Sequence, residues 1–533
     1  MTAVAPDVSA TPSFRESYNA AVDLVSRNLA TPERARKTAI VDSSGSYTYA
    51  ELAARVDRAA NAFLALGIAP EQRIALAVLD GIDFTASFLG AIKAGIIPIP
   101  LNTLFQAPDF AYILSDSRAK ALVVSHELAD TLLEAARLAD WHGLVLVSGA
   151  EAPSGALSLA RELERADPIA TAATTCADDV AFWLYSSGST GRPKGTVHVQ
   201  TSLVQTADAF ARDVLGFRES DVVYSAAKLF FAYGLGNALT FPMSVGATSV
   251  LFPGRPTPQA VSAILRDHAP TVFCGVPTLY NSLLAYDDFP KAGELALRLC
   301  TSAGEALPEE VARAWTARTG VEVVDGIGST EMLHIFVSNR PGDVRFGTTG
   351  TAVPGYRVRI VDEHDVDVEP GSLGELIVAG PTSAIHYWNN REKTRATFVG
   401  EWTRTGDKFV QREDGAYVHC GRVDDMLKVG GIWVSPMEVE GALIGHPAVL
   451  EAAVIGVPDE GDLIKPKAFV VLRDGFTGDD ALRDELKTFV KSRLAPYKYP
   501  RWFSFESELP KTATGKIQRH VLRKRESDAR ENV

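Results

Sequence analysis

The stretch Tyr185-Ser-Ser-Gly-Ser-Thr-Gly-Arg-Pro-Lys-Gly195 is the most informative segment of this 533-residue chain. Its glycines let the backbone bend tightly around an anion, and its serines and threonine add N–H and O–H donors. Arg192 and Lys194 contribute positive charge. A flexible glycine/serine linker is the alternative, but linkers rarely follow an apolar, strand-like run such as residues 180–185. The stretch therefore predicts a polyphosphate-binding loop.

This loop differs from the phosphate loop of kinases and GTPases. That pattern needs Gly-Lys-Ser/Thr at the start of a helix, whereas here Pro193 precedes Lys194 and Gly195 follows it. Kinase and GTPase functions are therefore excluded. The eleven residues resemble instead the phosphate loop of the adenylate-forming superfamily, which includes acyl- and aryl-CoA ligases, luciferases and nonribosomal peptide adenylation domains.

Length and composition indicate a globular protein of two to four domains or subdomains, with 46% hydrophobic and 22% charged residues. A net charge of −13 argues against a nucleic-acid partner. Because apolar stretches are short and residues 1–20 lack signal-peptide character, we expect a cytoplasmic protein without a membrane partner. The cysteines are too widely spaced to predict a disulfide framework or a zinc site.

Strand-like and helix-like segments alternate from residue 38 to about 420, which predicts an α/β domain with substantial parallel sheet. Thr48 and Glu51 form a capping box before an amphipathic helix, and residues 73–79 and 121–125 read as buried strands. We therefore expect a large N-terminal α/β domain over residues 1–423, and the resemblance implies that it is the adenylation domain.

A compact α+β unit of roughly a hundred residues follows Asp424. Ser435-Pro436-x-Glu438 predicts a capping box and a first-turn proline at the start of a helix. Strands are expected at 452–456 and 468–472, and a helix over 482–494. We expect a C-terminal domain over residues 424–533, joined through a short hinge, and the resemblance implies that this domain is mobile.

Further motifs match the adenylate-forming pattern in order and approximate spacing, so the resemblance covers about residues 38–525. Gly326-Ile-Gly-Ser-Thr-Glu331 follows a strand-like run, and we expect it on a loop at the strand's carboxyl end, where α/β sheets place ligands. The resemblance implies that Thr330 donates to the α-phosphate and that Glu331 helps to hold Mg²⁺. Ile327 stands where the family commonly has tyrosine.

The resemblance also assigns the nucleotide, the hinge and the catalytic lysine. It places Asp407 on the ribose hydroxyls, Arg422 on the ribose or phosphate, and a hinge at Asp424. Lys516, in Pro-Lys-Thr-Ala-Thr-Gly-Lys, matches the lysine that bridges the attacking acid and the α-phosphate. The catalytic group is Lys516, Thr330, Glu331 and Lys194, and Gly430 and Gly431 are expected beside the pantetheine arm of CoA. The ATP- and AMP-binding set is Ser186, Ser187, Gly188, Ser189, Thr190, Gly191, Lys194, Gly304, Glu305, Asp325, Gly326, Ile327, Gly328, Ser329, Thr330, Asp407, Arg422 and Lys428.

The acid site is expected at Phe231, Ala232, Tyr233, Ala303, Gly326, Gly328, Leu333, His334 and Ile335. Phe231 stands where amino-acid-activating relatives keep an aspartate, which argues against an α-amino acid substrate. Aromatic and small side chains suit a flat apolar ring, and residues 228–237 with 332–335 resemble the benzoate–CoA ligases. Plain core packing is the alternative for these aromatics.

The resemblance thus implies an ATP-dependent benzoate–CoA ligase of aromatic degradation, with Mg²⁺ as cofactor, ATP and CoA as co-substrates, and a domain rotation between half-reactions. Three alternatives stay open: another aryl or short- or medium-chain acyl-CoA ligase, an aryl-acid adenylation enzyme that loads a carrier protein, and a nucleotide-binding regulator without activity. A homodimer is also left open. Acetylation of Lys516, with an acetyltransferase and a deacetylase as partners, is a further hypothesis.

Overall fold

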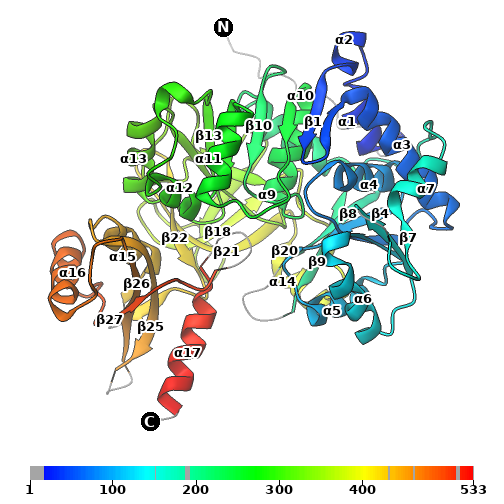
Figure 1. Cartoon of the computed structure of the whole chain (residues 1–533). Coiled ribbons are helices and arrows are strands. Elements are labelled where there is room, and N and C mark those ends of the chain that lie inside the picture. Colours follow the sequence, from blue (N-terminus) through cyan, green and yellow to red (C-terminus); the bar gives the residue numbers. More distant parts are fainter. Residues whose placement is uncertain are drawn as a thin grey trace, which may run out of the picture.

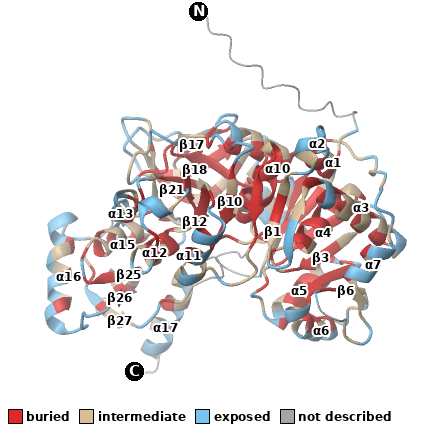
Figure 2. Ribbon diagram, turned by 45° about the horizontal axis from the view of Figure 1, so that its top comes forward, coloured by how far each residue is buried: buried red, intermediate tan, exposed pale blue. Residues whose placement is uncertain are grey.

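The computed structural model describes residues 17–149, 152–186, 192–429, 432–459, 463–511 and 517–531. A large N-terminal body of helices and sheets carries a small C-terminal body at one end (Figure 1). Buried residues gather along the sheets and on the helix faces that cover them (Figure 2). The mixed α/β architecture agrees with the prediction from the alternation of segments.

The largest sheet has nine strands in the order β16-β15-β14-β13-β12-β10-β11-β1-β2. The run from β14 to β1 is parallel, and antiparallel pairing adds β15 and then β16 at one end of the sheet and β2 at the other. Parallel strands bring their carboxyl ends to one edge, where α/β sheets bind ligands. The strands are β1 (Thr38–Asp42), β2 (Gly45–Thr48), β10 (Val222–Ser225), β11 (Thr248–Val250), β12 (Val272–Gly275), β13 (Leu299–Ser302), β14 (Val323–Gly328), β15 (Ile335–Ser338) and β16 (Thr351–Ala352).

A second sheet is entirely parallel, in the order β4-β3-β5-β6-β7. Two of its strands confirm the buried strands predicted from sequence. Its members are β3 (Arg73–Ala77), β4 (Ile97–Pro100), β5 (Ala121–Ser125), β6 (Leu144–Ser148) and β7 (Leu157–Ser158).

Two antiparallel sheets complete the N-terminal body. The hairpin of β8 (Val180–Ser186) and β9 (Lys194–Val199) flanks the predicted phosphate loop, and β19 (His386–Tyr387) adds to β9. The other sheet joins β17 (Arg357–Val361), β18 (Gly374–Ala379), β21 (Trp402–Gln411), β20 (Phe398–Val399) and β22 (Tyr417–Arg422).

Helices cover the sheets, and their caps follow the sequence. Thr48 and Glu51 form the predicted capping box, in which each side chain accepts a hydrogen bond from the other residue's backbone N–H. The α-helices of this body are α1 (Ala20–Ser26), α2 (Pro32–Ala35), α3 (Tyr49–Ala65), α4 (Ile82–Lys93), α5 (Ala107–Ser117), α6 (Ala129–Leu138), α7 (Leu159–Arg165), α8 (Ser202–Thr206), α9 (Ala232–Leu235), α10 (Phe241–Val245), α11 (Pro258–Asp267), α12 (Pro277–Leu284), α13 (Glu309–Thr319) and α14 (Arg391–Thr397).

The C-terminal body has its own apolar core and the expected α+β character. A hairpin of β23 (Leu427–Val429) and β24 (Ile432–Val434) precedes the sheet of β25 (Val449–Pro458), β26 (Ile464–Leu472) and β27 (Trp502–Glu506), with α15 (Pro436–Ile444), α16 (Asp480–Arg493) and α17 (Arg519–Glu531). Ser435 caps α15, but Glu438 forms an ion pair with Lys498 instead of returning to the cap. The prediction of a capping box is therefore confirmed for the Ser435 side chain and wrong for the Glu438 side chain.

A buried ion pair ties α17 to α15. The Arg519 guanidinium donates to both carboxylate oxygens of Glu440, at 3.0 and 2.6 Å, and Arg519 lies 3.8 Å from Asp425. Arg523 also pairs with Asp425, at 2.6 Å. These contacts couple the last helix to the segment that directly follows Asp424.

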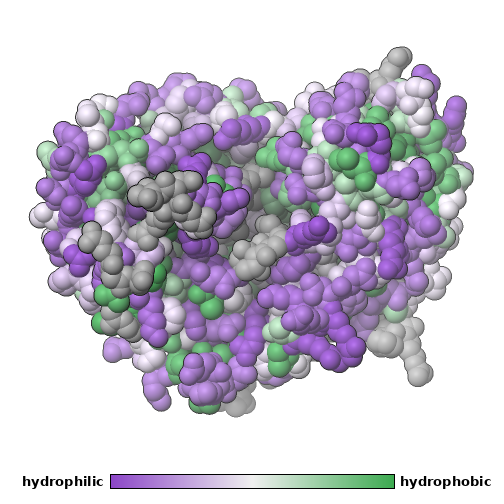
Figure 3. All heavy atoms as spheres, turned by 90° about the horizontal axis from the view of Figure 1, so that it is seen from below, coloured by the Kyte–Doolittle hydropathy of each residue, from purple (hydrophilic) through white to green (hydrophobic). Residues whose placement is uncertain are grey.

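The two bodies touch through polar contacts around a cavity of about 710 Å³. The Ile517 N–H donates to the Glu305 carboxylate at 2.9 Å, and Arg493 pairs with Glu310 at 3.1 Å. The molecular face in Figure 3 is hollowed near its centre and is mostly hydrophilic around the hollow. Interfaces of this polar kind are typical of domains that move relative to one another.

All four cysteines are free thiols. None of the described helices combines the length and apolar character needed to cross a bilayer.

Candidate active site

The β8–β9 hairpin sets the geometry of the phosphate loop. Its register pairs Ser186 with Lys194, so these two residues stand at the base of the loop. The Tyr185 hydroxyl donates to Asp116 at 2.6 Å and anchors the hairpin to α5. The Ser186 hydroxyl is buried and has no hydrogen-bond partner among the residues that the structure describes. Ser187, Gly188, Ser189, Thr190 and Gly191 lie outside the described residues.

Lys194 and Glu331, predicted as members of one site, lie together. Lys194 Nζ is 3.8 Å from Glu331 Oε1, and each side chain is only 17% exposed. Burial lowers the pKa of the Lys194 ammonium, and the Glu331 carboxylate opposes that shift. The hairpin therefore presents a cation to the loop that carries Thr330 and Glu331.

The sequence predicted a loop for the whole glycine motif before Glu331, and this prediction is wrong for its first three residues. β14 continues through Gly328 and pairs with β15, so the loop begins at Ser329. A Cβ at Gly326 would lie 2.9 Å from Ile335 Cγ2, and one at Gly328 would lie 2.5 Å from the His334 carbonyl oxygen. Glycine is needed at both positions because β15 crosses so closely.

The Thr330 backbone is held by His198, which the sequence analysis missed. His198 is fully buried on β9, and its Nε2 lies 2.8 Å from the Thr330 carbonyl oxygen. Its ring stacks on Phe182 at 5.2 Å. Burial lowers the pKa of His198 to about 4, so the ring is neutral and donates through Nε2. Strand β9 thus supports both Lys194 and the Thr330–Glu331 loop.

Buried histidines predict that acid destabilises the fold. In the window between about pH 6.5 and pH 4, His198 binds a proton in the unfolded chain but not in the folded one. For this histidine, the free energy of unfolding should therefore decrease by about 1.4 kcal/mol for each unit by which the pH is lowered within that window. His198→Gln keeps an amide donor and should flatten the curve by that amount, measured by denaturant unfolding. His142→Gln, at an exposed histidine, is the control, and unchanged slopes in both variants would contradict the prediction.

The predicted ribose contact lies where β21 and β22 pair. Asp407 and Arg422 are directly opposite each other, and Arg422 Nη1 lies 3.4 Å from both Asp407 oxygens. His419 Nε2 is 3.3 Å from Asp407 Oδ1. Gly406 has φ +70°, and a Cβ there would lie 2.9 Å from the Arg422 guanidinium. The Asp407 side chain is 9% exposed, which places a carboxylate and a guanidinium together at the edge of a buried site.

The predicted adenine wall follows the ends of β13 and β14. Gly304, with φ +97°, and Glu305 follow the end of β13 after one intervening residue, and Ser302 of β13 is paired with Asp325 of β14. Burial raises the pKa of the Asp325 carboxyl well above its usual range, although Ser302 and backbone N–H groups partly offset it. Burial therefore disfavours a negative charge on this part of the wall.

The predicted acid pocket centres on Tyr233 and His334. The Tyr233 hydroxyl lies 2.8 Å from Thr301 Oγ1, and His334 Nε2 lies 3.2 Å from the Tyr233 carbonyl oxygen. Their rings are 5.5 Å apart. A Cβ at Gly236 would lie 2.4 Å from the His334 ring, so only glycine allows this approach. Burial lowers the pKa of His334 to about 3, which keeps the ring neutral.

The other predicted acid-pocket residues divide into two groups. Phe231 and Ala232 are half-buried at the start of α9, whereas Ala303, Leu333 and Ile335 are buried within apolar clusters. Ile335 packs against Gly326, as described above. The structure shows these three side chains among apolar neighbours, and their place in the acid pocket stays a prediction.

The sequence also did not predict a buried ion pair between Lys228 and Asp80, next to the residues expected at the acid site. The Leu229 N–H donates to Asp80 Oδ1 at 3.1 Å, and Lys228 Nζ lies 3.9 Å from Asp80 Oδ2. Lys228 also donates to the Gly254 carbonyl at 2.7 Å. Asp80 comes from the β3–α4 connection, about 150 residues earlier in the chain. Only the folded chain brings this pair together.

The remaining predicted residues lie at or beyond the junction of the bodies. Asp424 is exposed in the turn between β22 and β23, and the Lys428 ammonium lies 5.6 Å from the Trp433 ring centre. Gly430, Gly431 and Lys516 lie outside the described residues. Ile517, the residue after Lys516, contacts Glu305 of the predicted adenine wall. The C-terminal body is thus docked beside the predicted nucleotide site.

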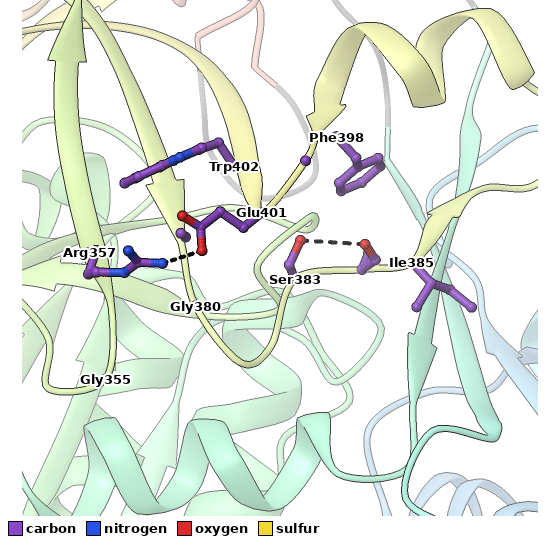
Figure 4. A pocket seen from close by; sticks show the side chains of 11 residues that line it. Gly355, Arg357, Gly380, Ser383, Ile385, Phe398, Glu401 and Trp402 are labelled. Carbon is purple, nitrogen blue, oxygen red and sulfur yellow. Dashed lines mark hydrogen bonds and ion pairs between the residues drawn. The ribbon is translucent and has the colours of Figure 1, made fainter. Parts of the chain in front are cut away.

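A second cavity, of about 490 Å³, adjoins the Glu331 loop without including any predicted site residue. Figure 4 shows Arg357 paired with Glu401 beside Trp402 on one side and Ser383 and Ile385 on the other. The N–H of Ala384, in the cavity wall, donates to the Glu331 carbonyl oxygen at 2.7 Å. This segment therefore supports the Glu331 backbone from outside the site.

The fold and these residues define an AMP-binding enzyme. A family model described as AMP-binding enzyme matches residues 29–388, and one described as AMP-binding enzyme C-terminal domain matches residues 438–516. The chain belongs to this family of adenylate-forming acid–thiol ligases.

Within the family, the chain is similar to ligases of aromatic acids. It is 58% identical to a benzoate–CoA ligase of Thauera aromatica, over 95% of this chain and 96% of that one. It is 51% identical to a 4-hydroxybenzoate–CoA/benzoate–CoA ligase of Rhodopseudomonas palustris, over 95% and 94%. A crystal structure of a benzoate CoA ligase from Burkholderia xenovorans matches with a TM-score of 0.89 and 51% identity, covering 95% of this chain and 100% of that chain.

Proposed function

We propose that this protein is an ATP-dependent benzoate–CoA ligase. The similarity to benzoate–CoA ligases over 95% of the chain is the observation that carries the proposal. The neutral aromatic pair of Tyr233 and His334 supports it, because a flat apolar ring can stack there without an unpaired charge. The substrates are benzoate, ATP and CoA, and the products are benzoyl-CoA, AMP and pyrophosphate.

In the first half-reaction, a benzoate oxygen attacks the α-phosphorus of ATP and pyrophosphate leaves. We assign the phosphates to residues 186–191 and Lys194, the α-phosphate to Thr330, and the ribose to Asp407 and Arg422. Lys516 bridges the attacking oxygen and the α-phosphate, which offsets the repulsion of two anions. His198 fixes the Thr330 carbonyl.

Glu331 is the residue that would hold Mg²⁺. This ion prefers oxygen ligands and is commonly held by one or two carboxylates together with substrate phosphates. Glu331 offers one partly exposed carboxylate next to the phosphate-loop lysine, so its chemistry fits. When bound, the ion neutralises phosphate charge during pyrophosphate departure.

In the second half-reaction, the CoA thiol loses its proton and attacks the benzoyl carbonyl carbon, and AMP leaves. We propose that the C-terminal domain, residues 424–533, rotates about Asp424 between the steps against the N-terminal domain of residues 1–423. Gly430 and Gly431 then line the pantetheine arm. Acetylation of Lys516 would delete the bridging charge and switch off adenylation; an unmodified Lys516 in inactive cellular protein, read by mass spectrometry, would argue against this control.

Product analysis by mass spectrometry tests the proposal. With ATP, Mg²⁺ and CoA, we expect benzoate to give benzoyl-CoA, AMP and pyrophosphate, and to react faster than cinnamates or medium-chain acids. Transfer to a carrier protein but not to free CoA would favour the carrier-loading alternative. Absence of benzoate-dependent pyrophosphate exchange would favour a regulator without activity.

A further inference from the structure

The register of a short strand places Tyr387 beside the phosphate-loop lysine. Tyr387 lies on β19 opposite Thr196 of β9. Lys194 is two residues from Thr196, and residues two apart on a strand face the same side of the sheet. Tyr387 is 3% exposed and so has a fixed position.

Tyr387 contacts two residues of the proposed site at once. Its hydroxyl donates to Glu331 Oε1 at 2.6 Å, and its ring centre lies 4.2 Å from Lys194 Nζ. A hydrogen bond to a carboxylate is among the stronger ones in proteins, and the cation above the ring adds a second attraction. Lys194 is also nearest to Oε1, at 3.8 Å.

These contacts determine which part of Glu331 faces a ligand. A carboxylate has two oxygens, and Tyr387 and Lys194 both approach Oε1. The other oxygen, Oε2, is the one that can meet a metal ion. The Tyr387 ring meanwhile holds the Lys194 ammonium at the base of the phosphate loop.

We propose that Tyr387 is a positioning residue for adenylation: its hydroxyl orients Glu331 toward Mg²⁺ and its ring holds Lys194 for the phosphates. The inference rests on the proposed function, because it requires Mg²⁺-dependent ATP binding at this site. It assigns a role to a side chain outside the ATP-binding set expected from sequence.

The test compares ATP binding with Mg²⁺ and with EDTA, by calorimetry, in two variants. Tyr387→Phe removes only the hydroxyl, so we expect affinity for ATP with Mg²⁺ to fall about tenfold while affinity in EDTA is unchanged. Tyr387→Leu also removes the ring and should weaken ATP binding in EDTA as well. Tyr49→Phe is the matched control, because the Tyr49 hydroxyl is buried and hydrogen-bonded to the Ala247 carbonyl, away from the site.

A double-mutant cycle separates positioning from a general structural effect. In a Glu331→Gln background, Tyr387→Phe should no longer reduce the gain in affinity that Mg²⁺ gives. An equal loss in both backgrounds, or an unchanged Mg²⁺ gain in Tyr387→Phe alone, would overturn the inference. If the wild-type protein itself neither binds ATP nor forms benzoyl-CoA, the proposed function fails instead.

Discussion

Replacing Lys516 with alanine should stop formation of benzoyl-adenylate while leaving its reaction with CoA nearly intact. The lysine is expected to act only when the acid oxygen approaches the α-phosphate. Removal of one such stabilising group costs on the order of 10²- to 10³-fold in rate. The thiol step needs no cation between two anions, so benzoyl-adenylate supplied directly should react within about threefold of the wild-type rate.

Two assays and a matched variant make this result decisive. Benzoate-dependent pyrophosphate exchange reports the first half-reaction, and thioester formation from synthetic benzoyl-adenylate reports the second. Lys511→Ala is the control, because Lys511 lies in the same segment but pairs with Glu451 at 2.6 Å. It should leave both half-reactions close to wild type. Equal loss of the two half-reactions in Lys516→Ala would contradict a lysine that serves adenylation alone.

Replacing Asp407 with alanine should raise the ATP concentration needed for activity more than any other change in the nucleotide site. Two hydrogen bonds from ribose hydroxyls to a carboxylate contribute about 1.5–3 kcal/mol each, so their loss should weaken ATP binding by about 10²- to 10⁴-fold. Arg422 would also lose its carboxylate partner but keep its hydrogen bond to the Thr405 carbonyl oxygen. Calorimetric titration with ATP measures the effect.

A variant of a second buried aspartate, Asp221, serves as the control that distinguishes a loss of nucleotide binding from a loss of stability. Asp221 is 2% exposed and pairs with Arg298, much as Asp407 pairs with Arg422. Asp221→Ala should lower the free energy of unfolding by about 3–5 kcal/mol but leave ATP affinity unchanged. If both variants lose ATP affinity to the same extent, Asp407 has no direct role on the ribose.

Structural features that depend only on residues close together in the chain could be predicted from the sequence. The cap formed by Thr48 and Glu51 spans four residues, and the alternation of apolar segments carries the α/β class. Residues 326–328 could not be assigned correctly, because pairing with β15 turns a glycine-rich segment into strand. Nothing in the residues around these glycines indicates that β15 will pair with them.

The same distinction applies to the candidate site. Lys194, Glu331, Asp407 and Arg422 belong to motifs, and the fold brings the members of each pair together. Tyr387 and His198 belong to no motif, and their contacts come from the register of β19 and β9. His198 is close to the phosphate loop in the sequence and Tyr387 is far from it, and nothing in the sequence gave their distances to Thr330 and Glu331.

The Arg519–Glu440 pair fixes the start of α17 to α15. Arg519 stands three residues after Lys516 and is fixed by two hydrogen bonds to a carboxylate on α15. Breaking such a buried pair costs about 3–5 kcal/mol, so thermal motion rarely detaches the start of α17 from the rest of the C-terminal body. In the domain rotation that we propose, α17 therefore moves together with α15. Acetylation of Lys516 would remove one positive charge and leave the charges of Arg519 and Glu440 unchanged.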